Sequence, residues 1–452
     1  MSQKNQFASR IGLIAATVGS AVGLGNVWRF PAETQVNGGA AFLLLYVICI
    51  FLFGIPVMLC EFSLGRGTHS DSIGAFKALS PSRPWWLVGL LAIVASFLIL
   101  SYYMVVAGWT LEYLIQSVTG NLYDGTGGSS LDSQFASHMD EYVCSDWNPL
   151  IMTYIVIGLN LIILLRGVQK GIEKMSNVLM PLLFILLVIF CCVALSLPKA
   201  MEGLQFFFHP DFSQITPAVV VNALGQAFFS LSLGMGILIT YSGYFSRKTN
   251  LTTTAATVSM LDMLVSVMMG VIIFPAVMSF GLESHQLEGS ALVFITLPEV
   301  FSAMPATQLW SSLFFLLLLI AALTSTLSLS EVAVSYIINR FDVSRVKACV
   351  YFVIPLTLLS TLCSLSQGSL SWLTICGKDI FAFLDATTTN IMLPVAAFLT
   401  CIYVGWFAPK NFFKQQINMP SRISPALSTM IWGIVRYVAP VLIIVIFVVN
   451  LL

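Results

Sequence analysis

The feature that most constrains this chain is a series of apolar runs, each long enough to cross a lipid bilayer as a helix. Such a helix needs about 20 apolar residues. Charged or turn-forming breaks separate eleven runs: 10–36, 39–66, 86–118, 149–166, 171–198, 214–245, 251–281, 308–340, 346–368, 372–406 and 425–452. Of 452 residues, 58% are hydrophobic and 9% are charged, whereas an ordinary soluble domain has roughly 25% charged residues. The sequence therefore predicts an all-α integral membrane protein embedded in the lipid bilayer, and excludes a soluble enzyme or a secreted scaffold.

The charges and cysteines narrow the class further. Twenty Lys and Arg residues balance twenty Asp and Glu residues, so no net positive field is present to attract nucleic acid. Most of the nine cysteines lie inside apolar runs, where a thiol behaves as a small hydrophobic group rather than as part of a disulfide framework. No Pro/Ser-rich linker divides the chain. We predict a single transmembrane domain over residues 1–452, without a nucleic-acid partner.

The distribution of basic residues predicts the orientation. With a cytoplasmic N-terminus, only Arg29, Lys199 and Lys378 fall on the outer side, and Arg436 falls in the inner part of the last run. The outer loop at about 119–148 holds four Asp, one Glu and no Lys or Arg. Because cytoplasmic loops are enriched in basic residues, this orientation is favoured. An odd number of spans then places the C-terminus outside.

Two of the runs contain residues that weaken a helix near mid-membrane. The first run contains Gly19, Gly23 and Gly25 followed by Asn26, and the sixth contains the segment 229–236, Phe-Ser-Leu-Ser-Leu-Gly-Met-Gly. Glycine costs about 1 kcal/mol per helical position relative to alanine. Close helix packing would explain one such run. A matched pair at positions one and six instead indicates two inverted five-helix repeats with broken helices around a ligand site, at about 8–198 and 214–406, with an eleventh helix at about 425–452.

Other buried polar residues point to an ion site or to structural pairs. The eighth run contains Ala321-Ala322-Leu323-Thr324-Ser325-Thr326, and its hydroxyls either bond back to the preceding turn or bind a small hard cation. Five ionisable residues lie deep in the runs, and such groups are costly in a membrane: Arg29, Glu61, Asp262, Glu331 and Asp385. For Glu61, close to Arg66, and for Glu331 the ordinary interpretation is a structural ion pair or a capping role near a helix end. Asp262 has no Lys or Arg nearby in sequence.

A set of motifs then gives a family resemblance that covers essentially the whole chain. The most specific string is Gly23-Leu24-Gly25-Asn26-Val27-Trp28-Arg29-Phe30-Pro31, preceded by Ala8-Ser9-Arg10 and followed by Asn37-Gly38-Gly39, Gly54-Ile55-Pro56, Glu61-Phe62-Ser63-Leu64-Gly65-Arg66, Tyr102-Tyr103, Gly225-Gln226-Ala227-Phe228-Phe229-Ser230-Leu231-Ser232 and Leu323-Thr324-Ser325. These motifs closely resemble those of the neurotransmitter:sodium symporters, in particular the bacterial branch with eleven spans. The resemblance implies a LeuT-type fold and sodium-coupled uptake of amino acids by alternating access, in a bacterial plasma (inner) membrane, rather than an enzyme.

The resemblance also assigns a substrate site. The carboxylate of the amino acid would meet the backbone amides of Leu24 and Gly25 and the hydroxyl of Tyr103, which is physically reasonable at a helix N-terminus. Its amine would face carbonyls of the two breaks, at Ala21, Phe229 and Ser232. The other residues implied to line the pocket are Ile99, Ser230, Met235, Ser325 and Leu329. Because the lining is apolar and Met235 is flexible, we expect branched and aromatic side chains.

Two sodium ions are implied as co-transported cargo. The first site resembles Ala21, Asn26, Ser230 and Asp262, completed by the substrate carboxylate, and the second resembles Gly19, Val22, Ala321, Thr324 and Ser325. The resemblance implies that Asp262 lies beside Tyr46, Gln226, Ser230 and Ser266, positions that resemble the chloride pocket of animal relatives. A carboxylate there would replace chloride, so transport is expected to be chloride-independent. A buried lone carboxylate also favours its neutral form once sodium leaves, which leaves open that Asp262 returns a proton.

The implied gates are less regular. Arg29 and Asp385 match an outer pair that closes above the site. On the inner side, Lys4 and Tyr244 match gate positions, but Lys4 replaces the usual arginine and Asn339 replaces the usual aspartate. Asp342 is an alternative partner three residues later. Gly171 and Pro181 match a pattern that lets the fifth helix unwind.

Two other classes of function would also use many spans. A channel needs repeated rings of carbonyls or charges along a pore, and the sequence has no such repeat. An intramembrane enzyme needs a nucleophile beside a base, yet all four histidines, His69, His138, His209 and His285, lie in or near the predicted loops.

Overall fold

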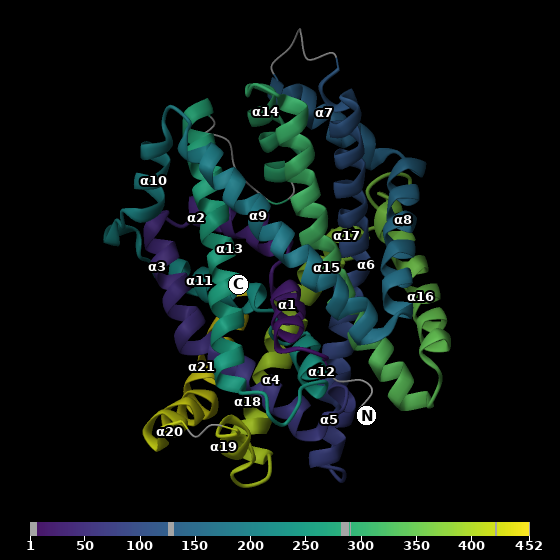
Figure 1. Cartoon of the computed structure of the whole chain (residues 1–452), viewed down its shortest axis with the longest axis vertical. Coiled ribbons are helices and arrows are strands. Elements are labelled where there is room, and N and C mark those ends of the chain that lie inside the picture. The colour runs from purple at the N-terminus through teal and green to yellow at the C-terminus, as the bar shows by residue number, and fades with distance from the viewer. Residues whose placement is uncertain (1–6, 125–130, 282–288, 290, 421–422, 452) are drawn as a thin grey trace.

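The chain folds into a bundle of helices in the computed structural model (Figure 1), which describes residues 7–124, 131–281, 289, 291–420 and 423–451. Within these residues the only β pairing is an isolated bridge between Ile375 and Lys378. The fold is therefore all-α, as the sequence predicts.

Nine helices in the described part of the chain are long and apolar enough to cross a membrane. Five of them are single helices: Trp86–Thr119 (α6), Trp147–Leu165 (α8), Leu251–Phe280 (α13), Thr307–Phe341 (α15) and Arg345–Leu365 (α16). Two further spans begin with shorter pieces: Ala40–Thr68 runs from α3 (Ala40–Cys49) to α4 (Ile55–Thr68), and Val168–Leu195 consists of η5 (Val168–Glu173) and α9 (Lys174–Leu195). The last two are Ile380–Phe407, with α17 (Ile380–Thr387), α18 (Leu393–Ile402) and η9 (Tyr403–Phe407), and Pro425–Val449, with α20 (Pro425–Gly433), η10 (Ile434–Val438) and most of α21 (Ala439–Leu451). Each one corresponds to a predicted run.

The first predicted run is broken as expected. Helix α1 (Arg10–Ala21) and the helix Gly25–Val36, formed by η2 (Gly25–Arg29) and α2 (Phe30–Val36), are bent by 55° at a short non-helical break. The break coincides with the glycine-rich string, where the backbone has little intrinsic preference for a helix.

The sixth predicted run is also broken. It consists of α11 (Pro217–Ser230) and α12 (Ile237–Gly243), separated by the non-helical residues 231–236. Ser232 (φ 54°), Gly234 (φ 79°) and Gly236 (φ 69°) all have positive φ angles in this segment, a conformation that glycine tolerates best. With the nine helices and the first broken span, this pair accounts for all eleven predicted runs.

Several boundaries differ from prediction. The tenth run is predicted over 372–406, but the helix begins at Ile380, after Asp379 caps its N-terminus. Shorter helices that the hydropathy pattern does not resolve lie between the spans: α5 (Ser72–Leu79), α7 (Leu131–Cys144), α10 (Ala200–Phe208), α14 (Leu297–Ser302) and α19 (Phe412–Ile417). Figure 1 shows α5, α19 and α20 at one end of the bundle and α7 and α14 at the other.

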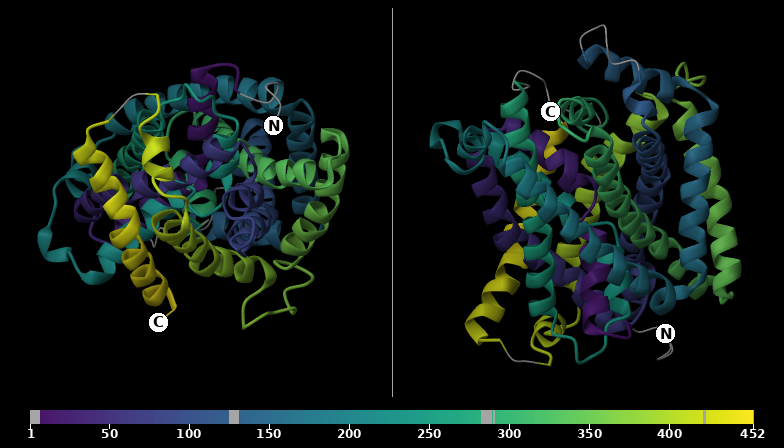
Figure 2. Two further views of the ribbon diagram at one scale, coloured as in Figure 1. Left: turned by 90° about the horizontal axis from the view of Figure 1, so that it is seen from below. Right: turned by 45° about the horizontal axis from the view of Figure 1, so that its top comes forward.

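The two broken spans lie in the middle of the bundle. Helix α1 packs against α15, α9 and α13, whereas α16 lies at the periphery, as Figures 1 and 2 show. The break of the sixth span contacts the last turn of α1, because the Ser232 hydroxyl donates to the Ser20 carbonyl at 2.8 Å. The fold thus places two stretches of unwound backbone side by side in the protein interior, where their polar groups are available to a ligand.

Candidate substrate and ion site

The unwound segment 231–236 is held by side chains from neighbouring helices. The Gly234 amide donates to the buried Glu61 carboxylate at 2.7 Å, and the Ser72 hydroxyl donates to the Gly236 carbonyl at 3.1 Å. Ser96 donates to the Met235 carbonyl. Because buried backbone groups need partners, these contacts stabilise the break in one conformation.

Glu61 supports this break rather than pairing with Arg66. The Arg66 guanidinium donates to the Thr249 carbonyl at 2.7 Å and to Gln416, and no ion pair between Glu61 and Arg66 occurs among the described residues. Of the two structural roles expected for Glu61, the ion pair with Arg66 does not form and the carboxylate instead accepts from a backbone amide, because each group finds a partner in a segment that is distant in sequence.

A cavity of about 30 Å³ lies between the two breaks. Its lining includes ten of the eleven substrate residues expected from sequence: Ala21, Gly25, Ile99, Tyr103, Phe229, Ser230, Ser232, Met235, Ser325 and Leu329. The eleventh, Leu24, lines a larger adjacent cavity. Ser20, Gly23 and Ile237 also line the small cavity and were missed, although the first two belong to the glycine-rich break of the first span.

Tyr103, which lines this cavity, bonds to the start of the second half of the first span. The Leu24 amide donates to the Tyr103 hydroxyl at 2.9 Å, and both groups lie where the second half of the first span begins. A helix N-terminus carries free amides and a partial positive charge, which favour a carboxylate. The part of the cavity beside Tyr103 is therefore suited to an anionic group.

Asp262 is the centre of a buried polar cluster beside the cavity. Its carboxylate accepts from the Ser230 hydroxyl at 2.6 Å and from Asn26 Nδ2 at 2.9 Å, and the Tyr46 hydroxyl lies 3.5 Å away. Asn26 Nδ2 also lies 2.9 Å from the Ser266 hydroxyl. Asp262 has no solvent exposure, and neither of the two ion pairs in the described part of the chain involves it. A buried carboxylate with hydrogen-bond donors but no cationic side chain is suited to a bound cation.

Gln226 bonds to the break of the first span instead. Its side-chain amide donates to the Gly25 carbonyl at 3.3 Å. Of the four residues that sequence placed around Asp262, the structure thus joins Tyr46, Ser230 and Ser266 to it in one hydrogen-bonded cluster.

A second set of oxygen atoms lies between α1 and α15. The Ser325 hydroxyl lies 3.1 Å from the Val22 carbonyl and 3.5 Å from the Gly19 carbonyl, and the Thr324 hydroxyl lies 3.0 Å from the Ala321 carbonyl. A β-carbon on Gly19 would lie 3.1 Å from Thr324, so glycine permits the close approach. Carbonyl and hydroxyl oxygens are donors for a hard cation, and all five predicted residues contribute to this set.

A wider cavity of about 800 Å³ adjoins the substrate cavity and shares Gly25, Tyr103 and Phe229 with it. We call it the vestibule. Arg29 and Asp385 both line it. Arg29 stacks on the Phe229 ring at 4.7 Å and pairs with Glu33 at 3.8 Å. No Arg29–Asp385 ion pair is present among the described residues, so the two predicted gate residues line one cavity without forming an ion pair.

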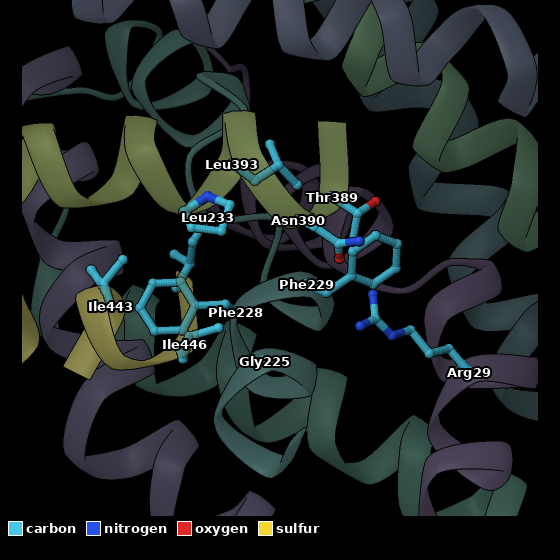
Figure 3. Close-up of a pocket in the computed structure, with 11 residues that line it drawn as sticks. Arg29, Gly225, Phe228, Phe229, Leu233, Thr389, Asn390, Leu393, Ile443 and Ile446 are labelled. Atoms are coloured by element: carbon cyan, nitrogen blue, oxygen red, sulfur yellow. The ribbon is translucent and has the colours of Figure 1, made fainter. Parts of the chain in front are cut away.

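Figure 3 shows the arrangement of Arg29 beside the Phe229 ring, with Thr389 and Asn390 near the same ring. These four residues also line a small pocket of about 30 Å³ that extends between α11, α18 and α21. Phe229 therefore separates the substrate cavity, the vestibule and this side pocket.

The opposite side of the cavity is closed by packed aromatic rings and one ion pair. The Tyr244 hydroxyl donates to Glu331 at 2.8 Å, and Arg345 pairs with the same carboxylate at 2.5 Å. The Phe7 ring packs against Tyr241 and Tyr244 at centroid distances of 5.9 and 6.2 Å. These contacts connect the segment that precedes α1 with three helices, namely α12, α15 and α16.

The other residues predicted for the inner gate are not part of this closure as far as the structure describes them. Lys4 lies outside the described residues. Asn339 donates to Asp71 at 2.9 Å, and Asp342 is exposed just beyond the end of α15. Arg345 was missed because its partner Glu331 is fourteen positions away and on another helix.

The fifth span is helical through both predicted unwinding residues. Gly171 lies in η5 and Pro181 lies inside α9. Near Gly171, the Glu173 carboxylate accepts from the amides of Ala8 and Ser9 at 2.8 and 3.0 Å. The start of the fifth span therefore holds the start of α1, a contact that sequence alone did not reveal.

Comparison with known proteins identifies the class. The model of the Sodium:neurotransmitter symporter family matches residues 4–136 and 134–452. The chain is 35% identical over 442 residues to the uncharacterized sodium-dependent transporter YhdH of Bacillus subtilis, covering 98% of this chain and 96% of that protein. It is 36% identical over 462 residues to an uncharacterized sodium-dependent transporter of Haemophilus influenzae, covering 99% and 98%. The crystal structure of MhsT in complex with L-phenylalanine is similar over 99% of both chains, with a TM-score of 0.89 and 39% identity.

These matches define a multi-pass membrane transporter rather than an enzyme. The chain belongs to the sodium:neurotransmitter symporter family, and its fold is the LeuT-type fold of MhsT, with broken first and sixth helices. The resemblance stated from the motifs is thereby confirmed, as is the predicted fold class.

Proposed function

We propose that this protein is a sodium-coupled symporter for hydrophobic amino acids, which moves two sodium ions with each substrate molecule by alternating access. The observation that carries the proposal is one apolar cavity with amide and hydroxyl donors at one end and an oxygen-rich ion set on each side. The bound phenylalanine named for MhsT, at 39% identity and with the same fold, supports an amino acid as the substrate.

The coupling follows from the shared position of the substrate carboxylate. Asn26, Ser230 and Asp262 lie next to the cavity end where the Leu24 amide and Tyr103 meet. A carboxylate bound there would complete the first sodium site together with the Ala21 carbonyl. Ion and substrate would then each strengthen the binding of the other, and this coupling is reciprocal.

Binding to purified protein in two buffers tests the proposal. A labelled hydrophobic amino acid should bind in sodium buffer and lose most of its binding in potassium buffer of equal ionic strength. Equal binding in the two buffers would rule out sodium coupling. A competition panel of unlabelled amino acids in the same assay ranks the substrates.

The Tyr103 hydroxyl is expected to contribute strongly to substrate affinity. In the Tyr103→Phe variant the substrate carboxylate loses one donor, and hydrogen bonds to charged groups contribute about 1.5–3 kcal/mol. Affinity should therefore fall by a factor of about 10 to 150, measured as the Kd in saturating sodium. Tyr154→Phe, which removes an exposed hydroxyl bonded to Thr361 on the periphery, is the control and should bind like the parent. A Tyr103→Phe variant with parental affinity would exclude this carboxylate position.

Met235 is expected to set the breadth of the substrate range. Its buried side chain lines the cavity with Ile99, Phe229 and Leu329, and a thioether chain repacks around different shapes. Met235→Phe adds a rigid ring, so tryptophan binding should weaken more than leucine binding. We expect the ratio of the two Kd values to change at least about tenfold. An unchanged ratio would place the substrate side chain away from Met235.

Alternating access assigns roles to the two closures. We infer that Arg29 and Asp385 meet when the vestibule closes over Phe229, and that Tyr244, together with Lys4 beyond the described residues, opens on the inner side. Unwinding near Gly171 and Pro181 would release the contact of Glu173 with the start of α1 and admit water to the second sodium site.

Two finer parts of the proposal depend on Asp262. Its carboxylate occupies the position where chloride would balance the sodium charge, so transport should be independent of chloride. The same group is the candidate for a proton that returns as sodium leaves. An inward sodium gradient in proteoliposomes with a trapped pH dye should then alkalinise the lumen only when substrate is present.

We also propose that the protein resides in the bacterial plasma (inner) membrane, with the N-terminus inside and the C-terminus outside. The predominance of Lys and Arg in the loops assigned to the cytoplasm supports this orientation. Labelling of single introduced cysteines from either side tests it.

A further inference from the structure

A group of cations and aromatic rings lies where the tenth span ends and the last span passes it. We call it the basic aromatic patch, and it consists of Trp406, Lys414, Trp432, Arg436 and Tyr437. The Arg436 guanidinium lies over the rings of Trp406, Trp432 and Tyr437 at 4.1, 4.8 and 5.3 Å. The Lys414 ammonium lies over the Trp432 ring at 5.0 Å. Two positive charges therefore share one indole ring.

The position of the patch is fixed by the backbone. The Trp406 indole N–H donates to the Arg436 carbonyl at 3.1 Å, and Gly405 allows the close approach, because a β-carbon there would lie 3.0 Å from the Arg436 Cα atom. Figure 1 shows α19 and α20, which flank the patch, at the same end of the bundle as α5. This is the end assigned to the cytoplasm.

The patch has no negative charge of its own. After Asp385 the chain contains no Asp or Glu, but it contains Lys410, Lys414, Arg422 and Arg436. The two ion pairs in the described part of the chain involve other arginines. Arg436 Nε is buried and has no hydrogen-bond partner among the described residues. A buried guanidinium N–H without an acceptor is costly, and an anion between Arg436 and Lys414 would remove that cost.

The surface that continues from the patch is apolar. Along α21 and the residue before it, the side chains at intervals of three or four residues are 41–60% exposed: Val438, Val441, Ile444, Val445 and Val448. Trp406 and Tyr437 are themselves 52% and 53% exposed. Rings of this kind are enriched at the level of lipid headgroups. One ligand with an anionic head and long apolar chains would satisfy the cations and cover this stripe together.

We propose that the basic aromatic patch binds an anionic glycerophospholipid of the inner leaflet. Its phosphodiester would lie between Arg436 and Lys414, and its acyl chains would lie along the exposed face of α21. Arginine is suited to this role because its planar fork donates to phosphate oxygens and stacks on aromatic rings. The proposal depends on the orientation proposed above but not on the identity of the transported amino acid.

Native mass spectrometry of the purified protein tests the proposal. The protein is reconstituted with equal phosphatidylglycerol and phosphatidylcholine and released from detergent, and the retained lipids are counted. The parent should retain phosphatidylglycerol in preference. In Arg436→Gln the retention should fall about fivefold, the effect expected for one basic residue at a charged membrane surface. Lys414→Gln, outside the last span, should lower it in the same direction if Arg436→Gln folds poorly.

The control is Lys347→Gln, which removes an exposed positive charge on the peripheral helix α16. It should retain phosphatidylglycerol like the parent. Parental retention by both patch variants, or an equal loss in the control, would overturn the proposal. A second arm measures thermal stability with added phosphatidylglycerol or inorganic phosphate. Phosphatidylglycerol alone should raise the Tm of the parent, and equal protection by inorganic phosphate would show a phosphate site instead of a lipid site.

Discussion

Replacing Asp262 by asparagine is expected to lower sodium-driven amino acid uptake at least about tenfold in chloride-free medium, and chloride is expected to restore part of it. Asp262 has no exposure and accepts hydrogen bonds from Ser230 and Asn26 at 2.6 and 2.9 Å. Asparagine keeps the size of the side chain but removes its charge. Sodium would then enter a buried site without a counter-charge, which is unfavourable in a medium of low dielectric.

The measurement is initial uptake by proteoliposomes in chloride and in gluconate. Ser259→Ala is the matched control, because Ser259 is buried on the same helix and its hydroxyl has no hydrogen-bond partner among the described residues. The control and the parent should transport equally in both media. If Asp262→Asn also transports like the parent, with or without chloride, then the carboxylate does not replace an anion.

The second large effect is expected where Glu331, Arg345 and Tyr244 close the side of the cavity opposite the vestibule. Glu331→Leu leaves the Arg345 guanidinium without its carboxylate partner at 2.5 Å and leaves the Tyr244 hydroxyl without its acceptor. Removal of one member of a buried ion pair typically destabilises a protein by about 3–5 kcal/mol. We therefore expect the variant to lose folded protein at a temperature well below the Tm of the parent, in a thermal assay monitored by size-exclusion chromatography.

A second substitution separates loss of charge pairing from loss of packing. Arg345→Met in the Glu331→Leu background removes the stranded charge and should recover a large part of the stability. Asp342→Asn, which changes an exposed carboxylate at the end of α15, should leave stability within about 0.5 kcal/mol of the parent. A Glu331→Leu variant as stable as the parent would show that the ion pair does not hold the inner side closed.

The breaks in the first and sixth spans could be predicted because their causes are local. Glycine at Gly23 and Gly25, or at Gly234 and Gly236, weakens a helix wherever it occurs, and the offset of five spans between the two breaks indicates how the repeats match. The proximity of the oxygen-bearing residues on α1 and α15 could also be predicted, once the motifs on these two helices were matched to a family. Composition alone did not indicate which carbonyl and hydroxyl oxygens of α1 and α15 lie together.

Contacts between distant segments could not be predicted. Glu61 lies near Arg66 in sequence, but it accepts from the Gly234 amide, which is 173 positions away. Likewise, Glu173 holds the start of α1 across 165 positions. Such partners depend on how helices pack, and neither periodicity nor spacing reports this.

The start of the tenth span shows a different limit. Trp372, Leu373 and Ile375 made the region before Ile380 resemble a membrane helix, but their side chains are 73%, 38% and 41% exposed in a connecting segment. Cys376 and Gly377 there have positive φ angles, which interrupt a helix. Hydropathy reports the apolar character of a segment and not its backbone conformation.

Uptake driven by an imposed sodium gradient tests the central claim most directly. Proteoliposomes containing the protein and potassium inside are diluted into sodium medium with a labelled hydrophobic amino acid, and the internal concentration is followed over time. The account predicts transient accumulation above the external concentration, which disappears when a sodium ionophore removes the gradient and when potassium replaces external sodium. Equal uptake with and without the sodium gradient, or an ion current that needs no substrate, would contradict sodium-coupled symport.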